Sequence, residues 1–139
     1  FRIANEKNNQ LMNVKLSLVF SRNEETDGIV VRRYYSLETE RASVLFLPTA
    51  WTVVHPIIKE SVLYGQTQES LKQSDGEFIV SVEAINDTMI DPVHTRMSYL
   101  YNELIWGAKF KSMLEPIGLE YVLDLSKINE VDSIKLNKY

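Results

Sequence analysis

The amino-acid sequence predicts an all-β domain, a β-sandwich with one short helix. Two segments carry most of this prediction. In Leu11–Ser21 apolar and polar residues alternate, as they do in a strand that buries one face. Phe78–Ile85 is rich in the β-branched residues that favour strands. We expect about seven short strands separated by turn signals, a series that is typical of a sandwich.

Further strands are expected between these two segments. The polar stretch Asn23–Gly28 ends in glycine and precedes a run of apolar residues that starts at Ile29, and this predicts a β-hairpin. Short apolar runs at Val44–Leu47 and Trp51–Ile57 predict two more strands. Pro48 separates these runs, because proline cannot donate a hydrogen bond within a sheet.

Gln66–Ser74 is the one predicted helix, with Thr67 as its N-cap and Leu71 as its contact with the core. The composition of Met97–Trp106 leaves helix and strand open. Its Leu, Glu and Met residues favour a helix, whereas its Tyr, Ile and Trp residues favour a strand. Val122–Leu125 is expected to form a last short strand.

A single domain is expected over residues 1–139, because the sequence contains no internal repeat, low-complexity tract or linker. The chain from Asn129 onward is polar and is expected to be loosely ordered. The sequence begins at Phe1 with residues typical of the middle of a protein, so we interpret it as a piece of a longer chain. No apolar run reaches the roughly 18 to 20 residues that span a bilayer.

Charge and composition exclude several classes of function. The 15 basic and 19 acidic residues give a net charge of −4, which argues against non-specific binding of nucleic acid. The sequence contains no cysteine, so disulfides and thiolate metal sites are excluded. With only two histidines, a structural zinc site is not expected.

No catalytic motif is present either. The sequence has no phosphate-binding glycine loop and no G-x-S-x-G segment. Glu83, Asp87 and Asp91 are the one candidate carboxylate cluster for metal or acid–base chemistry. On an extended chain Glu83 and Asp87 share a face but lie roughly 13 Å apart, which is too far for a shared ion. We therefore expect no enzyme, no cofactor and no metal site.

Seven segments, in order and at compatible spacing, resemble motifs of the cytoplasmic domain of inward-rectifier potassium channels, and of their bacterial branch in particular. They are FRIAN at 1–5, WTVVHPI at 51–57, SVLYG at 61–65, EFIVSVE at 77–83, RMSYL at 96–100, NELIWG at 102–107 and DLSK at 124–127. Each motif is short, but the ordered set extends over nearly the whole chain.

The resemblance implies an immunoglobulin-like (E-set) β-sandwich, four copies of which surround a water-filled tunnel that continues a membrane pore. It implies that Met97–Trp106 is a strand and that Asp124–Lys127 is the closing strand. The implied function is to extend the ion pathway and to couple ligand or lipid signals to gating. The implied location is the cytoplasmic face of the bacterial inner membrane. The implied partners are a homotetramer, potassium ions, magnesium or polyamines, and anionic phospholipid headgroups, without nucleic acid.

Two acids are candidates for the ion pathway. Glu83 matches a family acid that faces the tunnel, so four copies would form a carboxylate ring that concentrates cations. The alternative is a solvated acid near a strand end. The family's second tunnel acid directly follows the hairpin glycine, where this sequence has Ile29. Either Asp27 takes its place or one ring of charge is missing, which would weaken rectification.

The segment Ala84–Ile90 matches the girdle at the membrane end of the family's tunnel. Small or apolar side chains form a constriction there, and Ile85, Met89 or Ile90 could close it by excluding water. Ala84 stands where glycine is common in the family, so this girdle is expected to be stiff. The alternative is an ordinary loop between two strands.

Four further residues match family positions with partners outside the chain. Asp87 and Arg96 match an acid–base pair across the subunit boundary, and the alternative is two unrelated surface charges. Arg2 and, more loosely, Arg22 match lipid-proximal positions. A solvated surface charge is the preferred interpretation of Lys15.

Other functions remain open from the sequence. The main alternative is a stand-alone immunoglobulin-like module that binds a protein or a carbohydrate. A metal-dependent hydrolase that uses Glu83, Asp87 or Asp91 is a more distant alternative. His55 is expected to be a hydrogen-bonded structural residue rather than a pH sensor.

Overall fold

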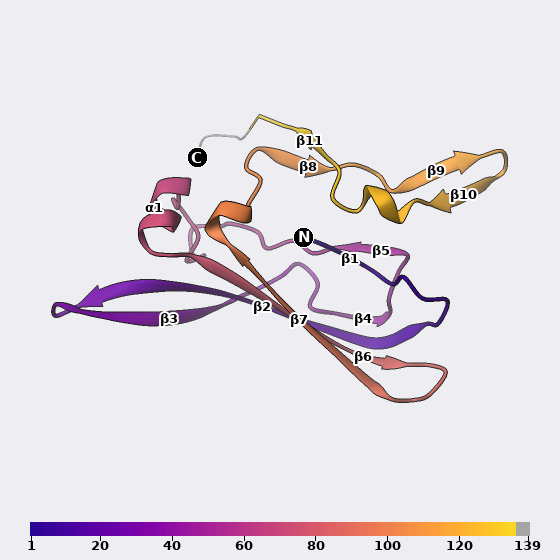
Figure 1. Ribbon diagram of the computed structural model, residues 1–139, viewed down its shortest axis with the longest axis horizontal. Coiled ribbons are helices and arrows are strands. Elements are labelled where there is room, and N and C mark those ends of the chain that lie inside the picture. The colour runs from indigo at the N-terminus through magenta and orange to yellow at the C-terminus, as the bar shows by residue number, and fades with distance from the viewer. Residues whose placement is uncertain (136–139) are drawn as a thin grey trace.

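The computed structural model describes residues 1–135, which form eleven β-strands, one α-helix and two short 3-10 helices (Figure 1). In chain order they are β1 (Arg2–Ala4), β2 (Leu11–Thr26), β3 (Ile29–Leu37), β4 (Ser43–Phe46), β5 (Ala50–Thr52), α1 (Gln68–Gln73), β6 (Glu77–Asn86), β7 (Pro92–Leu100), η1 (Tyr101–Glu103), β8 (Ala108–Phe110), β9 (Leu114–Ile117), β10 (Glu120–Leu123), η2 (Leu125–Lys127) and β11 (Val131–Ser133). The prediction of an all-β sandwich with one short helix is confirmed.

Five strands form the main antiparallel sheet. Their order is β3-β2-β6-β7, and β4 pairs with the first part of β2. The alternation predicted for the segment that became β2 is confirmed, because Val14 and Phe20 are fully buried and Leu16 and Leu18 are nearly so. Burying alternate side chains of this long strand fixes which face of the sheet is the core.

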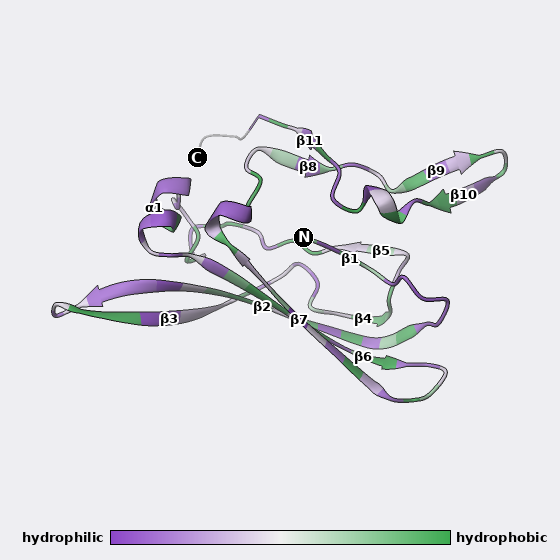
Figure 2. Ribbon diagram, in the orientation of Figure 1, coloured by the Kyte–Doolittle hydropathy of each residue, from purple (hydrophilic) through white to green (hydrophobic). Residues whose placement is uncertain are grey.

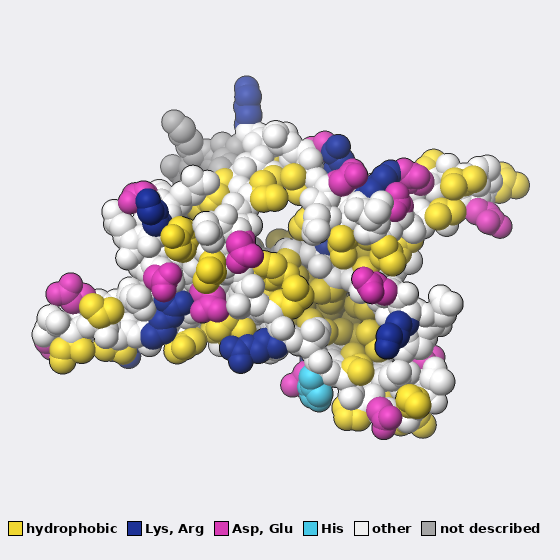
Figure 3. All heavy atoms as spheres, in the orientation of Figure 1, with side chains coloured by type: hydrophobic (Ala, Val, Ile, Leu, Met, Phe, Trp, Pro, Cys, Tyr) yellow, Lys and Arg dark blue, Asp and Glu magenta, His cyan; other side chains and the backbone are white. Residues whose placement is uncertain are grey.

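A second layer covers the inner face of the main sheet. The strands β1 and β5 pair antiparallel and lie above the sheet in Figure 1. Trp51 and Val53, from β5 and the residue after it, are buried in the same core cluster as Phe20 and Val80. Figure 3 shows hydrophobic side chains gathered in the centre of this view.

The helix α1 is fixed at its first turn by a reciprocal cap. The Ser70 amide donates to Thr67 Oγ1 (3.1 Å), and the Thr67 amide donates to Ser70 Oγ (2.8 Å). These bonds satisfy backbone donors that the first turn of a helix leaves unpaired. Leu71 is 2% exposed, so the predicted N-cap and core contact are both confirmed.

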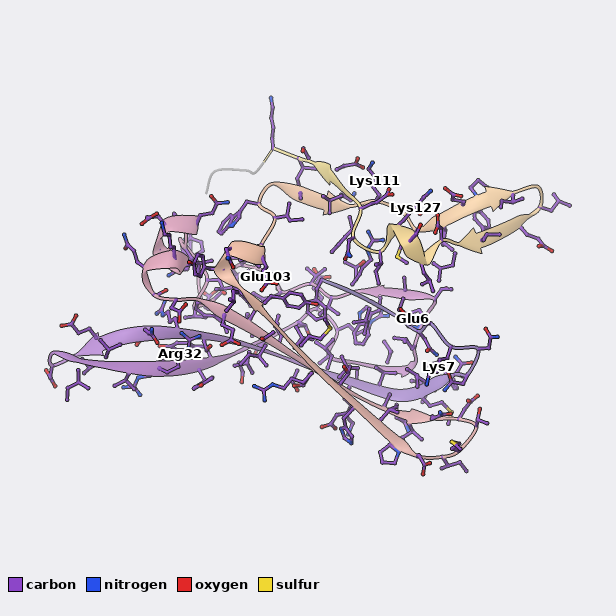
Figure 4. All side chains as sticks on the ribbon, viewed as in Figure 1. Glu6, Lys7, Arg32, Glu103, Lys111 and Lys127 are labelled. Atoms are coloured by element: carbon purple, nitrogen blue, oxygen red, sulfur yellow. The ribbon has the colours of Figure 1, made fainter. Side chains whose placement is uncertain are left out.

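The C-terminal part forms two short ribbons, β8 with β11 and β9 with β10. In Figure 1 they lie on the side of β1 and β5 that faces away from the main sheet. An ion pair between Lys127 and Glu115 joins η2 to β9 of the β9–β10 ribbon. Figure 4 labels Lys127 beside this ribbon. Figure 2 shows hydrophobic residues along this ribbon, where Leu119 and Tyr121 are exposed.

The predicted strand Met97–Trp106 is correct only as far as Leu100, where β7 ends. Two hydrogen bonds turn the chain there. The Leu100 amide donates to the Glu103 carboxylate (2.7 Å), and the Tyr101 amide donates to the Gly76 carbonyl (2.9 Å). The turn η1 therefore replaces the second half of the expected strand, and Figure 4 labels Glu103 at this turn.

Two expectations for the C-terminal end were wrong. Asp124–Lys127 is not a strand, because the Asp124 carboxylate accepts from the Ser126 amide (3.0 Å) and hydroxyl (2.6 Å) and so caps the 3-10 helix η2. The chain beyond Asn129 is not loose as far as it is described, since Val131–Ser133 forms β11.

Two strand boundaries also differ from the expected ones. Of the strand predicted over Trp51–Ile57, only Trp51 and Thr52 are in a strand, at the end of β5 (Ala50–Thr52). The hairpin turn is two residues long, since β2 continues to Thr26 and β3 starts at Ile29. Within residues 1–135 no helix combines the length and apolar character needed to cross a bilayer.

Candidate functional site

Glu83 lies on the outer face of the main sheet, away from the core. Its neighbours on β6 alternate with it, and Ala84 is 6% exposed. Glu83 is directly opposite Lys15 on β2 and His94 on β7. Directly opposed residues of antiparallel strands point to the same side of a sheet, so these three side chains share the outer face.

The Glu83 carboxylate is open to solvent and has one ionisable neighbour within 4 Å. His94 Nδ1 lies 3.8 Å from Glu83 Oε1, and the two side chains are 63% and 62% exposed. Lys15 is also exposed. The Glu83 carboxylate is therefore accessible to solvent, with His94 and Lys15 as its register partners on the neighbouring strands.

Asp27 lies far from Glu83 within the chain. It is the first residue of the two-residue hairpin turn, where Asp27 and Gly28 have φ of 52° and 74°, as the twist of a tight hairpin requires. It lies twelve positions along the chain from Lys15 of β2, which is roughly 40 Å at about 3.3 Å per residue. The two predicted pathway acids are therefore not brought together in one chain.

The predicted girdle is the end of β6 and the turn that follows it. Ala84 and Ile85 are strand residues, whereas Met89 and Ile90 are turn residues that are 71% and 77% exposed. Ile90 has φ of +55°, a conformation that is rare for a β-branched residue and costs free energy. The turn therefore presents two apolar side chains to solvent on a strained backbone.

Asp87 anchors this turn to the loop before β2. Its carboxylate accepts from the Gln10 amide (3.1 Å), and its own amide donates to the Gln10 carbonyl (3.1 Å). The Asn86 side chain accepts from the Thr88 amide (2.9 Å). The sequence did not reveal this anchor, because residues 10 and 87 are distant in the chain.

Arg96 has no partner for its charge among the residues that the structure describes. It lies opposite Ser81 on the outer face and is exposed, and Asp87 lies at the far end of β6. The structure thus does not join Asp87 and Arg96 within one chain. A pairing between subunits stays a prediction.

Arg2 is half-buried and contacts the C-terminal ribbons. Its guanidinium carbon lies 4.3 Å from the centre of the Phe110 ring, and its Nη2 donates to the Glu130 carbonyl (3.2 Å). The Nε atom is buried without a hydrogen-bond partner, and burial lowers the pKa of Arg2. This side chain therefore links β1 to the ribbon of β8 and β11.

Arg22 also has partners within the chain. Its Nε donates to Glu24 Oε1 (2.8 Å), and its guanidinium lies 5.4 Å from the centre of the Tyr35 ring. The Tyr35 hydroxyl donates to the same carboxylate, and this hydrogen bond, with Arg22, lowers the pKa of Glu24. Neither predicted lipid-proximal arginine is a free surface charge.

His55 has the structural role that the sequence suggested. Its Nδ1 contacts the Glu38 carbonyl (2.5 Å), and its Nε2 contacts Ser61 Oγ (2.7 Å). A carbonyl can only accept, so Nδ1 carries the proton and Nε2 accepts from the Ser61 hydroxyl when the ring is neutral. The ring thus joins the segment after β5 to the loop after β3, and it also links two parts of its own segment through Ser61. Within residues 1–135, no three His, Asp or Glu side chains are grouped so that they could hold a metal ion.

The strained turn gives a direct prediction. Ile90→Asn is expected to raise the free energy of unfolding by about 1 kcal/mol, because asparagine tolerates positive φ and the exposed isoleucine loses little burial. Met89→Asn is the matched control and should change stability by less than about 0.5 kcal/mol. Urea unfolding followed by circular dichroism measures both, and a destabilised Ile90→Asn variant would contradict the prediction.

Comparison with known proteins finds inward rectifier potassium channels by two routes, a family model and individual relatives. The family model described as "Inward rectifier potassium channel C-terminal domain" matches residues 1–139. The inward rectifier potassium channel Kirbac3.1 of Paramagnetospirillum magnetotacticum is 35% identical over 133 residues, which are 94% of this chain and 45% of that protein. Human inward rectifier potassium channel 4 is 30% identical over 86 residues, or 62% of this chain and 19% of that protein.

A third relative is the bovine ATP-sensitive inward rectifier potassium channel 12, which is 30% identical over 86 residues, or 62% of this chain and 20% of that protein. The chain spans less than half the length of these relatives. The match to the family model nevertheless extends from the first residue to the last. This chain therefore belongs to the inward rectifier potassium channel family, as a C-terminal domain of that family.

Proposed function

We propose that this chain is the cytoplasmic part of a tetrameric potassium channel at the inner membrane of a bacterium, where it extends the ion pathway and couples ligand or lipid signals to gating. Four copies would surround the pathway with the outer face of the main sheet toward the axis. The observation that carries the proposal is the solvent-exposed Glu83 carboxylate at the end of β6. The same strand leads directly into the turn with Met89 and Ile90.

A ring of four carboxylates would concentrate cations. At about 8 Å from the axis in bulk-like water, each Glu83 would attract a monovalent cation by roughly 0.5 kcal/mol, and four by about 2 kcal/mol. Screening reduces this about threefold at one Debye length. A divalent or polyvalent blocker such as magnesium or a polyamine gains in proportion to its charge, so the ring acts mainly on these ions.

The turn between β6 and β7 would form the girdle of the pathway. Exposed Met89 and Ile90, together with Ile85 near the end of β6, would give an apolar ring that closes by excluding water when it narrows. The anchor between Asp87 and Gln10 ties this ring to the loop after β1. Movement of that loop would therefore be transmitted to the girdle, which supports a role in gating.

Anionic phospholipid headgroups are proposed partners through Arg2 and Arg22. A basic residue near an anionic leaflet gains about 1 kcal/mol. Arg2 would have to give up Phe110 and Glu130, and Arg22 would have to give up Glu24, to bind a headgroup. These two arginines would therefore supply little lipid affinity by themselves, and other parts of the channel would supply most of it.

Glu83→Gln tests the proposed ion pathway. In the full-length channel, the variant is expected to weaken block by internal magnesium by about tenfold and block by polyamines by more, because four charges are lost from the ring. Patch-clamp recording from excised membranes measures the block. Glu120→Gln is the matched control, since Glu120 is an exposed acid on the distant β10. Unchanged block in Glu83→Gln channels that conduct potassium would reject Glu83 as a pathway residue.

A further inference from the structure

Three strands of the main sheet place a row of ionisable side chains across the proposed pathway face. The register aligns Lys15 of β2, Glu83 of β6 and His94 of β7. On its other edge β2 pairs with β4, which places the uncharged Ser43 opposite Lys15. The carboxylate is therefore flanked on one side by a permanent cation and on the other by an imidazole.

The neighbouring row adds a further positive charge. Two residues away on each strand, the register aligns Ser17, Ser81 and Arg96, and alternation places them on the same face. Next to Glu83, then, this face carries two permanent cations and one imidazole. This local balance is opposite in sign to the net charge of −4 of the whole chain.

We propose that Lys15 and His94 set how strongly the Glu83 ring attracts cations, Lys15 as a fixed opposing charge and His94 as one controlled by protons. This inference rests on the proposed function. The groups that face Glu83 within the described residues are Lys15 from β2 and His94 and Arg96 from β7. An imidazole gains its charge between about pH 5 and 8. Acidification would thus add up to four positive charges to the ring and weaken its hold on multivalent cations.

The effect of Lys15 is tested by removing its charge. In the full-length channel, Lys15→Gln is expected to strengthen block by internal magnesium by about tenfold. This change is as large as the weakening of block expected for Glu83→Gln, because each variant changes the charge of the ring by four units. Lys15→Arg keeps the charge and should leave the block unchanged. Lys59→Gln removes an exposed lysine from the loop after β5 and is the control for loss of charge elsewhere.

The effect of His94 is tested by pH. Magnesium is the probe, because its charge does not change with pH. Between pH 7.5 and 5.5 the wild-type block is expected to weaken by about tenfold, as four imidazoles become charged. His94→Gln should abolish this dependence. His94→Lys should show the weak block of the acidic state at every pH.

The outcomes separate this inference from the proposed function. If Glu83→Gln weakens the block while Lys15→Gln and His94→Gln leave it unchanged, the proposal that Lys15 and His94 control the Glu83 ring is overturned. The pathway role of Glu83 then stands. If Glu83→Gln has no effect in a conducting channel, the proposed pathway itself fails. A block that weakens in acid equally in wild type and His94→Gln also overturns the role of His94.

Discussion

Phe20→Ala is expected to lower the free energy of unfolding by about 3–5 kcal/mol. Phe20 is fully buried at the centre of the main sheet. Its ring lies 5.0 Å from that of Phe78 and 6.5 Å from that of Tyr35, so truncation removes burial and two ring contacts together. The expected result is a transition midpoint at markedly lower urea concentration, measured by circular dichroism or tryptophan fluorescence.

Two variants separate the loss of packing from other effects. Phe20→Leu keeps most of the volume and should cost only about 1–2 kcal/mol. Val30→Ala, on β3, removes an apolar side chain that is 65% exposed and should cost less than about 0.5 kcal/mol. A Phe20→Ala protein as stable as Val30→Ala would show that the core does not form around Phe20.

Arg96→Ala is expected to weaken association of the subunits. Removing one member of a buried ion pair costs about 3–5 kcal/mol, because the other charge is left without a partner. Arg96 has no charged partner within its own described chain, and Asp87 carries the matching charge at the end of β6. If the two pair across a subunit boundary, the Arg96→Ala channel should dissociate at protein concentrations at which the wild type remains tetrameric. Multi-angle light scattering of the detergent-solubilised channel measures this.

Asp87→Asn gives the sharper test of the same pair. The amide oxygen can still accept from the Gln10 backbone, so the anchor of the girdle turn is kept while the charge is removed. Asp87→Asn should weaken association as Arg96→Ala does, and the double variant should be no weaker than either single one. Arg41→Ala, at an exposed arginine in the loop before β4, is the control. Undiminished association of Arg96→Ala would reject the pair.

The row of Lys15, Glu83 and His94 and the proposed girdle together lead to an expectation for rectification. The proposed pathway face carries one carboxylate per subunit beside the fixed cation Lys15, with Arg96 as a second cation where it is not paired with Asp87 of another subunit. Ile29 stands where the resemblance to the family leads us to expect an acid. Rectification by multivalent cations is therefore expected to be weak at neutral pH and weaker in acid. This expectation follows from local charge, whereas the net charge of the chain suggests the opposite.

Several elements could be predicted from the sequence because they depend on local physics. The alternation in Leu11–Ser21 defines a face with period two, and Thr67 can cap α1 because its hydroxyl reaches an amide three residues away. Where a non-local hydrogen bond competes with local preference, prediction failed. The strand expected over Met97–Trp106 ends at Leu100, because the Gly76 carbonyl accepts from the Tyr101 amide.

The sequence by itself determined the all-β class, the helix and, through its ordered motifs, the family, and it singled out Glu83 as a candidate pathway residue. Only the tertiary structure decided which charges surround that carboxylate. Lys15 and His94 are 68 and 11 residues from Glu83 in the chain. No local sequence pattern predicts that β2, β6 and β7 pair in this register. Likewise, Arg2 resembles a free basic residue in the sequence, and its contact with Phe110 arises only when β1 packs against β8. Pairing between distant strands is fixed by the burial of a common core, and that is why these neighbours follow from the fold and not from the sequence alone.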